Sequence, residues 1–475
     1  MPFSVCAWDP CLARFLPVSL CVQARLVVGG SRTAMVGASA GWNCLLPSKT
    51  HACFVGRVQT LACLAVKWVC CQLGAREHYA IPCALFRLNA LGCLLTDAWV
   101  PPSSLLAKAC DRMSKLTDRF HNELRDAPVA AFNSSLILFE ALARARGLTG
   151  WTKIIARNRW FQRKVAAFLN SQLSTLNSQL ILLSYSYTAL EPFRYAKLRG
   201  WKTLLVQIDP GPEEEKIVAE EVARVPALAG EWQPDPEEYR SFWREECQLA
   251  DRIIVNSEWS RDGLTRDGIP SDKLSVIPLA YQKPEVRHQQ SEVRVAREYP
   301  ARFTAERPLR VLFLGLVNLR KGVARLLEAA RILQDEPVEF WLVGPVEIAN
   351  PAGVITATAR VKWFGPVDRN QAAEYYRNAD VFILPTLSDG FAITQLEAQA
   401  NGLPVIASKF CGEVIENDVN GIILEKPSAA CIATAIRDCV ADPAQLRRFS
   451  TASRVRDEFT IEALSQHLQE LGATL

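Results

Sequence analysis

Residues 380–408 place two carboxylates around one turn and one helix. Residues 381–384 form a short apolar run and residues 403–407 form another, as is typical of buried strands, with a helix of about ten residues expected between them. Two strands joined by a helix form a parallel crossover, which directs the helix N-terminus toward the carboxyl edge of the sheet, where anionic ligands bind. Asp389 lies in the turn before this helix, and Glu397 lies within it.

The turn that starts at Asp389 combines hydrogen-bond donors with acceptors. Gly390, Phe391 and Ala392 offer backbone N–H groups to an anion. The carboxylates of Asp389 and Glu397 can accept hydrogen bonds from hydroxyls. Donors for phosphate beside acceptors for hydroxyls indicate a nucleotide-sugar site. The alternative is an ordinary crossover in which Asp389 caps the helix and Glu397 faces solvent.

A pair of cations accompanies a second expected helix. Residues 309–315 predict a buried strand, and residues 323–333 carry apolar side chains at helical spacing. Arg320 and Lys321 fall in the expected first turn of that helix, where the helix dipole disfavours positive charge. A bound anion would offset this cost. In the alternative interpretation, the two cations extend into solvent.

These residues resemble the signature of the family-4 glycosyltransferases, or glycosyl transferases group 1, which are retaining enzymes of the GT-B fold. The resemblance rests on the Asp389 turn, on Glu397 eight residues later and on the sequence NGLPVI at 401–406. It implies that Asp389 and the amides after it hold the donor sugar and phosphate, and that Glu397 holds the ribose hydroxyls. Lys321 carries over as the residue that binds the diphosphate, in a loop that begins at Gly315.

Three positions depart from the family pattern. The family usually has Glu where Asp389 stands and Gly where Ala392 stands, and many members have Arg at the position of Leu316. Arg320, four residues further on, is the candidate replacement for that arginine.

The first half of the chain predicts an open α/β sheet. Within the family, the glycine-bearing loop after the first strand faces the donor phosphates and the acceptor, and Gly74 is the matching residue. Arg76 and Glu77 are adjacent polar candidates, while His78 and Asp209 are the candidates on the acceptor side. Each of these side chains also fits a helix cap or a capping turn. Strands are expected at 64–72, 92–99, 128–132, 180–185, 203–208 and 252–256.

Length and periodicity predict several domains, because 475 residues are too many for one compact core. The expected fold class is α/β: the GT-B fold, with two Rossmann-like, doubly wound parallel-sheet domains that face each other across a cleft. We expect an N-terminal extension at 1–63 that is poorly ordered or non-native, an acceptor domain at 64–283, a linker at 284–307, a nucleotide-sugar-binding domain at 308–450 and a C-terminal helix at 451–475 that, by resemblance, crosses back to the first domain.

Composition excludes several classes of protein. A net charge of +4 is too weak to indicate a nucleic-acid partner, and neither zinc-finger spacing nor an aromatic RNA-binding stripe is present. Eleven of the fifteen cysteines precede residue 111, none forms a CxxC pair and the total is odd. This pattern favours free thiols in a reducing cytoplasm over disulfides or a zinc site. No segment has the pattern of a signal peptide or a membrane span.

Residues 153–169 combine five cations with three aromatic side chains at helical spacing. Such a helix can lie on an anionic membrane, and related enzymes often glycosylate lipid-linked acceptors. A cytoplasmic protein with peripheral contact at the inner face of the membrane would fit this pattern. The alternative is a surface helix that packs its apolar stripe inward.

The resemblance implies a retaining, hexosyltransferase-type enzyme that moves a sugar from a nucleotide-diphosphate sugar to a glycan, lipid-linked or small-molecule acceptor. Asp389, Lys321 and Arg320 are the expected catalytic residues, because charge develops on the leaving oxygen and the sugar ring. We expect no metal and no other cofactor. The alternatives are a catalytically silent GT-B protein that binds nucleotide sugars, and an epimerase or phosphorylase of the same fold.

Overall fold

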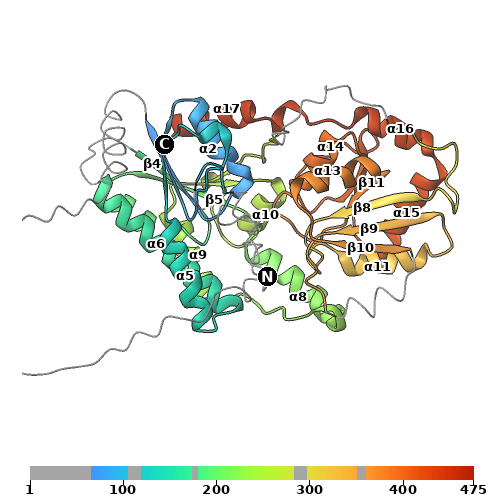
Figure 1. Ribbon diagram of the computed structural model, residues 1–475, viewed down its shortest axis with the longest axis horizontal. Coiled ribbons are helices and arrows are strands. Elements are labelled where there is room, and N and C mark those ends of the chain that lie inside the picture. The colour runs from blue at the N-terminus through green and yellow to red at the C-terminus, as the bar shows by residue number, and fades with distance from the viewer. Residues whose placement is uncertain (1–65, 105–118, 174–179, 283–296, 350–359) are drawn as a thin grey trace, which may run out of the picture.

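The computed structural model describes residues 66–104, 119–173, 180–282, 297–349 and 360–475. It contains two parallel sheets, each with hydrophobic clusters on both of its faces, and helices cover these faces (Figure 1). The α/β class and the two doubly wound sheets expected from the sequence are confirmed. The expected extension at 1–63 and residues 284–296 of the expected linker lie outside the described residues.

The first sheet has seven strands in the order β3-β2-β1-β4-β5-β6-β7, all paired in parallel. Every residue of β2 and β4 is buried, since helices cover both faces, and this burial explains their continuous apolar sequences. The strand order reverses at β1, which lies between β2 and β4, and ligands bind beyond the carboxyl ends at such a point. The strands are β1 (Lys67–Gln72), β2 (Leu91–Thr96), β3 (Val129–Ala131), β4 (Leu180–Tyr185), β5 (Lys202–Gln207), β6 (Arg252–Val255) and β7 (Leu274–Val276).

The helices of the first domain divide between the two faces of its sheet. One hydrophobic cluster takes side chains from α6, α7 and α9, and the cluster on the other face takes side chains from α2 and from the C-terminal helix α17. The elements are η3 (Arg76–Tyr79), α2 (Ala80–Arg87), η4 (Asn122–Leu124), α5 (Asn133–Ala145), α6 (Gly150–Gln172), α7 (Leu190–Leu198), α8 (Pro212–Arg224), η5 (Pro226–Leu228), α9 (Glu237–Leu249), α10 (Glu258–Arg266) and η6 (Ser271–Lys273).

The second sheet has six parallel strands in the order β10-β9-β8-β11-β12-β13. β8 and β11 are neighbours, so the loops that follow them lie at the same edge. The elements are β8 (Leu309–Leu314), α11 (Val323–Ile332), β9 (Val338–Val343), β10 (Val361–Gly365), α13 (Arg369–Asn378), β11 (Val381–Leu384), α14 (Thr394–Ala400), β12 (Val405–Ser408), β13 (Gly421–Leu424), α15 (Ala429–Ala441), α16 (Pro443–Ala452), η7 (Asp457–Phe459) and α17 (Ile461–Ala473).

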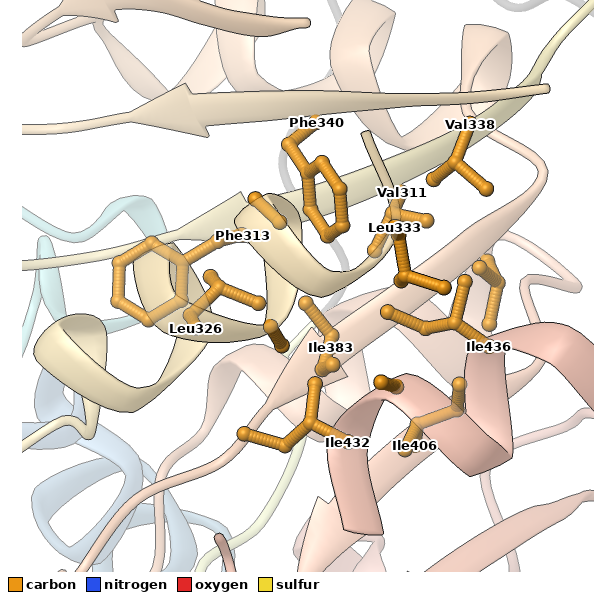
Figure 2. Packing of buried hydrophobic residues seen from close by; sticks show 14 of the residues in the cluster. Val311, Phe313, Leu326, Leu333, Val338, Phe340, Ile383, Ile406, Ile432 and Ile436 are labelled. Atoms are coloured by element: carbon orange, nitrogen blue, oxygen red, sulfur yellow. The ribbon is translucent and has the colours of Figure 1, made fainter. Parts of the chain in front are cut away.

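A hydrophobic core fixes α11 against the second sheet. Phe313 of β8 and Phe340 of β9 lie in the same cluster as Leu326 of α11 and Ile432 of α15, and each of these side chains is at most 1% exposed (Figure 2). Because both β8 and α11 are anchored in this way, the loop that joins them is held at both of its ends.

The chain returns to the first domain at its C-terminus. α17 lies beside α2 (Figure 1). Leu464 and Leu468 of α17 lie in the core cluster that contains α2, and Arg87 of α2 forms an ion pair with Glu462 (2.6 Å). Where the chain returns, the backbone N–H of Tyr281 donates to the carbonyl of Phe459 (2.7 Å). A segment that follows the first sheet is therefore hydrogen-bonded to the segment that precedes α17.

Two helices begin later than their sequence patterns predict. α14 begins at Thr394, five residues after Asp389, and α11 begins at Val323. The sequence predicted that Arg320 and Lys321 lie in the first turn of α11. This prediction is wrong, because both residues lie before the helix. The reason is Gly322, whose left-handed φ of 73° interrupts the helical path.

Candidate functional site

The loop between β8 and α11 is held close to the loop that follows β11. Gly315 has a φ of 145°, a conformation that glycine adopts readily. The backbone N–H of Lys321 donates to Asn318 Oδ1 (3.1 Å). A Cβ on Gly322 would collide with the carbonyl of Pro385, so only glycine permits this approach. The two loops thus place Lys321 beside the turn after β11.

Arg320, Lys321 and Asp389 meet in one buried group. Lys321 Nζ forms an ion pair with Asp389 Oδ2, and Arg320 Nη1 lies 3.3 Å from the same oxygen. Arg320 and Asp389 are each 8% exposed. Burial opposes ionisation of Asp389, but Lys321 and Arg320 outweigh that effect, so its pKa lies below the ordinary value. The three residues named as catalytic from the sequence are therefore neighbours.

A further ionisable residue, Glu214, reaches this group from the first domain. Glu214 lies in the first turn of α8, and its Oε2 is 3.5 Å from Arg320 Nη1. The same oxygen accepts a hydrogen bond from Ser388 Oγ (3.1 Å). Burial raises the pKa of Glu214, Arg320 opposes the rise and Asp389 adds to it. We call Glu214, Arg320, Lys321 and Asp389 the charge cluster, and it spans both domains.

The turn after β11 also packs directly on the first domain. The carbonyl of Gly390 accepts hydrogen bonds from Ser257 Oγ (2.5 Å) and Ser260 Oγ (3.4 Å). A Cβ at position 390 would collide with the carbonyl of Ile208 and would lie 2.8 Å from Asn256 Nδ2. Only a glycine fits between these groups without displacing them.

Phe391 and Ala392 shape the turn. The Phe391 side chain is 1% exposed and meets the ring of Phe459 at 5.8 Å between centroids. Its backbone N–H donates to Asp389 Oδ1 (3.3 Å), so the carboxylate of the turn already engages this amide. Ala392 has a left-handed φ of 63°, which costs a non-glycine residue about 1–2 kcal/mol. This conformation explains why glycine suits the position.

Glu397 belongs to a different group of residues. The hydroxyl of Tyr376, on α13, donates to Glu397 Oε2 (2.8 Å). Burial raises the pKa of Glu397, while the Tyr376 hydrogen bond and the charge of Arg369 oppose the rise. The structure therefore brings Arg320, Lys321 and Asp389 together, and it places Glu397 beside α13 with Tyr376 as its hydrogen-bond partner.

Buried charged side chains hold the loop after β1 in place. The backbone N–H of Gly74 donates to Asp97 Oδ1 (2.9 Å), and a Cβ on Gly74 would lie 2.8 Å from Arg119 Nη1. Asp97 is fully buried and forms ion pairs with Arg119 (3.3 Å) and Arg157 (2.9 Å). Arg157, one of the cations of the predicted membrane helix, therefore points into the first domain.

Three residues of this loop have left-handed backbone conformations: Glu77 (φ 50°), His78 (φ 52°) and Tyr79 (φ 65°). The sequence contains no glycine at these positions to predict such a turn. Burial, Arg369 and His121 together lower the pKa of His78 to about 4, so its imidazole is neutral at pH 7. Burial raises the pKa of Glu77 to about 7, against the opposing charge of Arg76.

Asp209 lies after β5, at the carboxyl edge of the first sheet. Its carboxylate accepts hydrogen bonds from Tyr187 Oη (3.1 Å), Gln207 Nε2 (2.9 Å) and Gly211 N (2.7 Å). Burial and the neighbouring carboxylate of Glu214 raise its pKa to about 7. Asp209 is thus electrostatically linked to the charge cluster.

A small cavity opens beside Asp209, in the same part of the first domain. Tyr187 and Tyr239 stack there, with ring centroids 4.4 Å apart and planes at 10°. Ser186 also lines the cavity, and its Oγ is buried without a hydrogen-bond partner. The cavity is lined by Leu73, Arg76, Ile154, Asn158, Ser186, Tyr187, Thr188 and Tyr239.

The sequence interpretation missed Glu214 and Tyr187. The available signal for Glu214 was the run of three glutamates at 213–215 directly after Pro212, but such a run also fits simple stabilisation of a helix N-terminus. Tyr187 lies two residues after the end of β4, and no local pattern distinguishes it from an ordinary loop residue. No pattern within the first half of the chain points to partners in the second half.

Comparison with known proteins agrees with this architecture. Residues 297–456 match the family model described as glycosyl transferases group 1. The chain resembles the D-inositol 3-phosphate glycosyltransferase of Corynebacterium kroppenstedtii, with 25% identity over 266 residues, or 52% of this chain and 58% of the relative. The enzyme of the same name from Geodermatophilus obscurus is 32% identical over 210 residues, or 40% of this chain and 46% of the relative. The chain thus spans about half the length of the curated relatives it matches.

Solved structures share the fold across most of the chain. Anabaena HepE in complex with UDP-glucose superposes with a TM-score of 0.54 at 14% identity and covers 86% of this chain and 100% of its own. The glycosyltransferase WaaG, involved in lipopolysaccharide biosynthesis, gives a TM-score of 0.52 at 14% identity, with 84% and 99% coverage. The expectation of a GT-B fold is confirmed. Among the helices in the described ranges, none is both long and apolar enough to cross a bilayer.

Proposed function

We propose that the chain is a retaining glycosyltransferase that transfers a sugar from a nucleotide-diphosphate sugar. The observation that carries this proposal is the convergence of Arg320 and Lys321 on Asp389, at the edge where the loops after β8 and β11 meet. The group 1 family match and the names of the relatives support it. The HepE structure contains UDP-glucose, which supports a nucleotide-sugar donor.

In the proposed reaction, the acceptor hydroxyl oxygen bonds to the anomeric carbon as the bond from that carbon to the diphosphate oxygen breaks. The hydroxyl proton passes to the leaving diphosphate, and attack from the face that the diphosphate leaves retains the anomeric configuration. Lys321 and Arg320 would stabilise the negative charge on the leaving group. Asp389 would stabilise the positive charge on the sugar ring. No metal, cofactor or protein nucleophile is assigned a step.

Binding of a donor would change the ion pairs within the charge cluster. Arg320 is already shared between Glu214 and Asp389, so its charge is compensated before any ligand binds. A diphosphate would supply the counter-charge in place of Glu214 and leave Asp389 to contact the sugar. Glu397, oriented by Tyr376, would accept the ribose hydroxyls.

The acceptor would bind at the carboxyl edge of the first sheet. Asp209 lies at this edge together with Arg76 and the stacked pair Tyr187 and Tyr239. Aromatic faces and a carboxylate suit a sugar or polyol hydroxyl, and His78, neutral at pH 7, can exchange hydrogen bonds with one. A glycan, a lipid-linked sugar and a small polyol all present such hydroxyls.

Activity tests the proposal directly. Purified full-length protein is incubated with UDP-, GDP- and ADP-sugars and a panel of acceptors, and release of the nucleoside diphosphate is followed. Acceptor-dependent release that is lost in Lys321→Ala and Glu397→Gln supports transfer. Product that forms without an acceptor supports an epimerase, and product that requires inorganic phosphate supports a phosphorylase.

The rival proposal is a nucleotide-sugar-binding protein without turnover. It is favoured by the departures from the family pattern at Leu316, Asp389 and Ala392, and by a charge cluster that is already compensated. Calorimetric binding of the same donor panel would distinguish the two, since binding without acceptor-dependent turnover would overturn the transferase.

We further propose that α5 and α6 contact an anionic membrane surface. α6 buries its own apolar stripe, including Phe161 and Val165, as the alternative sequence interpretation stated. α5, in contrast, exposes Ile137 (53%) and Leu138 (60%). A groove of about 610 Å³ separates the two helices and has a basic rim, with no acidic residue among its lining side chains: Phe139, Leu142, Ala143, Arg146, Leu148, Ala156, Arg159, Trp160, Arg163, Lys164 and Ala167.

Vesicle sedimentation tests this contact. The protein should sediment with phosphatidylglycerol vesicles and not with phosphatidylcholine vesicles, and added salt should weaken the binding. Leu138→Glu should abolish it, whereas Leu198→Glu, at an 87% exposed position on α7, should not. Equal loss in both variants would contradict a role for this surface.

A further inference from the structure

Three side chains of the first domain gather metal-ligating atoms at one point, away from the charge cluster. One ligand atom each from Cys83 of α2, from His121 and from Glu123 of η4 lies within 4.8 Å of the other two. Cys83 Sγ is 3.4 Å from His121 Nδ1. Cys83 is buried, and the other two side chains are half-buried.

Each of the two half-buried side chains is oriented by a second partner. His121 Nε2 lies 3.1 Å from Gln282 Oε1, and because an amide oxygen only accepts, Nε2 carries the proton. Nδ1 then presents its lone pair toward Cys83 Sγ. The Arg87 guanidinium donates to both carboxylate oxygens of Glu123, at 2.6 Å and 3.0 Å, and also forms an ion pair with Glu462. Partners of this kind fix the tautomer and orientation of metal ligands in proteins.

We propose that Cys83, His121 and Glu123 bind a zinc ion. Thiolate sulfur, imidazole nitrogen and carboxylate oxygen are the atoms that Zn²⁺ takes in proteins. A tetrahedral zinc with ordinary bond lengths separates its sulfur and nitrogen ligands by about 3.6 Å, close to the 3.4 Å between these two atoms. The thiolate and the carboxylate balance the charge of the ion, while Arg87 is balanced by Glu462. A water molecule can complete the fourth position.

The site escapes the sequence patterns for zinc because its ligands do not form a short repeat. Cys83 and His121 are 38 residues apart in the sequence. The third ligand is a carboxylate and not a second thiol. Folding of α2 against η4 brings them together. Within the described residues, the interpretation of the cysteines as free thiols therefore holds for the seven other than Cys83.

The position of the site gives the ion a structural role at the domain boundary. Gln282, which accepts from His121, also accepts through its backbone carbonyl from Arg369 Nη2 of α13 (2.8 Å). The charge of Arg369 acts on both sides of the boundary: it adds to the effect of burial in lowering the pKa of His78, and it opposes the effect of burial, which raises the pKa of Glu397. A metal that fixes His121 thus fixes a chain of contacts from the first domain to the second.

Metal analysis of the purified full-length protein tests the proposal. The protein is stripped with a chelator, titrated with zinc chloride and analysed by mass spectrometry for metal content. One zinc per chain and a higher melting temperature are expected for the wild type and for Cys439→Ser, a matched change at a buried thiol of the second domain. Cys83→Ser and Glu123→Gln should lose both effects.

Cobalt substitution supplies a spectroscopic readout of the thiolate ligand, and its decisive arm uses the wild-type protein. Co²⁺ bound to the wild type should show a sulfur-to-cobalt charge-transfer band, because the proposal includes a thiolate ligand. Gln282→Ala should retain the band and weaken metal affinity about 10–100-fold. Failure of the wild type to bind zinc in a stoichiometric amount, or to show the thiolate band, would overturn the proposal.

Discussion

The carboxyl edges of the two sheets face each other with opposite electrostatic behaviour. At the edge of the second sheet, Lys321 and Arg320 hold the pKa of Asp389 below its ordinary value. At the edge of the first sheet, burial raises the pKa of Asp209 and of Glu77 to about 7. The same type of side chain is a fixed anion on one side and a group that titrates near neutrality on the other. A carboxylate at a sheet edge therefore acquires its role from the cations around it.

Of the changes that test this contrast, removal of the Lys321 side chain should have the largest effect, and the effect should be on kcat. Lys321→Ala is expected to lower kcat about 10²–10³-fold, because one charged contact to the leaving group is lost. Steady-state kinetics with a saturating donor measure the effect. Lys409→Ala, at an exposed lysine paired with Glu425, is the matched control and should leave kcat unchanged. Equal rates for the wild type and Lys321→Ala would remove the charge cluster from the chemistry.

A side chain at position 390 should force the two edges apart. Gly390→Ala would place a Cβ against the carbonyl of Ile208, so the turn must shift away from the first domain. A displacement of this size is expected to lower kcat/KM roughly tenfold to a hundredfold. Small-angle scattering should show a larger radius of gyration. Gly200→Ala is the control, because its added Cβ meets no atom within 4 Å and tests only left-handed backbone strain.

The two edges should contribute to stability with opposite pH dependence. The pKa of Asp209 is raised from 3.8 to about 7, so the folded state binds the proton more tightly and the free energy of unfolding falls as pH rises through this range. Asp209→Asn should make that slope shallower. Denaturant unfolding at a series of pH values measures the slope.

Asp389 should behave in the reverse sense. Its folded pKa lies below the ordinary value, so its contribution to stability is complete above that value and is lost as pH falls through the folded pKa. Asp389→Asn should therefore reduce the loss of stability in acid. If both variants shifted the slope in the same direction, the electrostatic contrast between the edges would be wrong.

The smallest expected effect concerns backbone strain in the turn after β11. Ala392→Gly should stabilise the protein by about 1 kcal/mol or less, because relief of the left-handed conformation exceeds the entropic cost of glycine only slightly. Ala398→Gly, within α14, is the matched control and should destabilise. Thermal unfolding compares the two. A lower melting temperature for both would indicate that Ala392 is not strained.

Local patterns carried most of what the sequence predicted. Continuous apolar runs identified β8 and β11, because strands covered on both faces leave no polar alternation. Adjacent strands then placed Lys321 and Asp389 at one edge. Both predictions depend on interactions near in sequence or on the general rules of parallel sheets, and neither requires knowledge of how the two domains meet.

What the sequence did not predict depends on contacts between distant segments. Glu214 joins Arg320 only because α8 approaches the loop after β8 across the domain boundary. Glu77 and His78 adopt left-handed conformations that their residue types disfavour, so surrounding packing must impose them. The start of α11 was misplaced because the role of Gly322 depends on the carbonyl of Pro385.

The hydrogen bond between Tyr281 and Phe459 limits how the protein can open. The bond joins the segment that follows β7 to the segment that precedes α17, so a relative rotation of the two domains either preserves this backbone hydrogen bond or breaks it. We expect the domains to open by a swing about an axis near this bond, because that motion leaves the bond intact. Such a swing would separate Gly390 from Ser257 while α17 stays seated on α2.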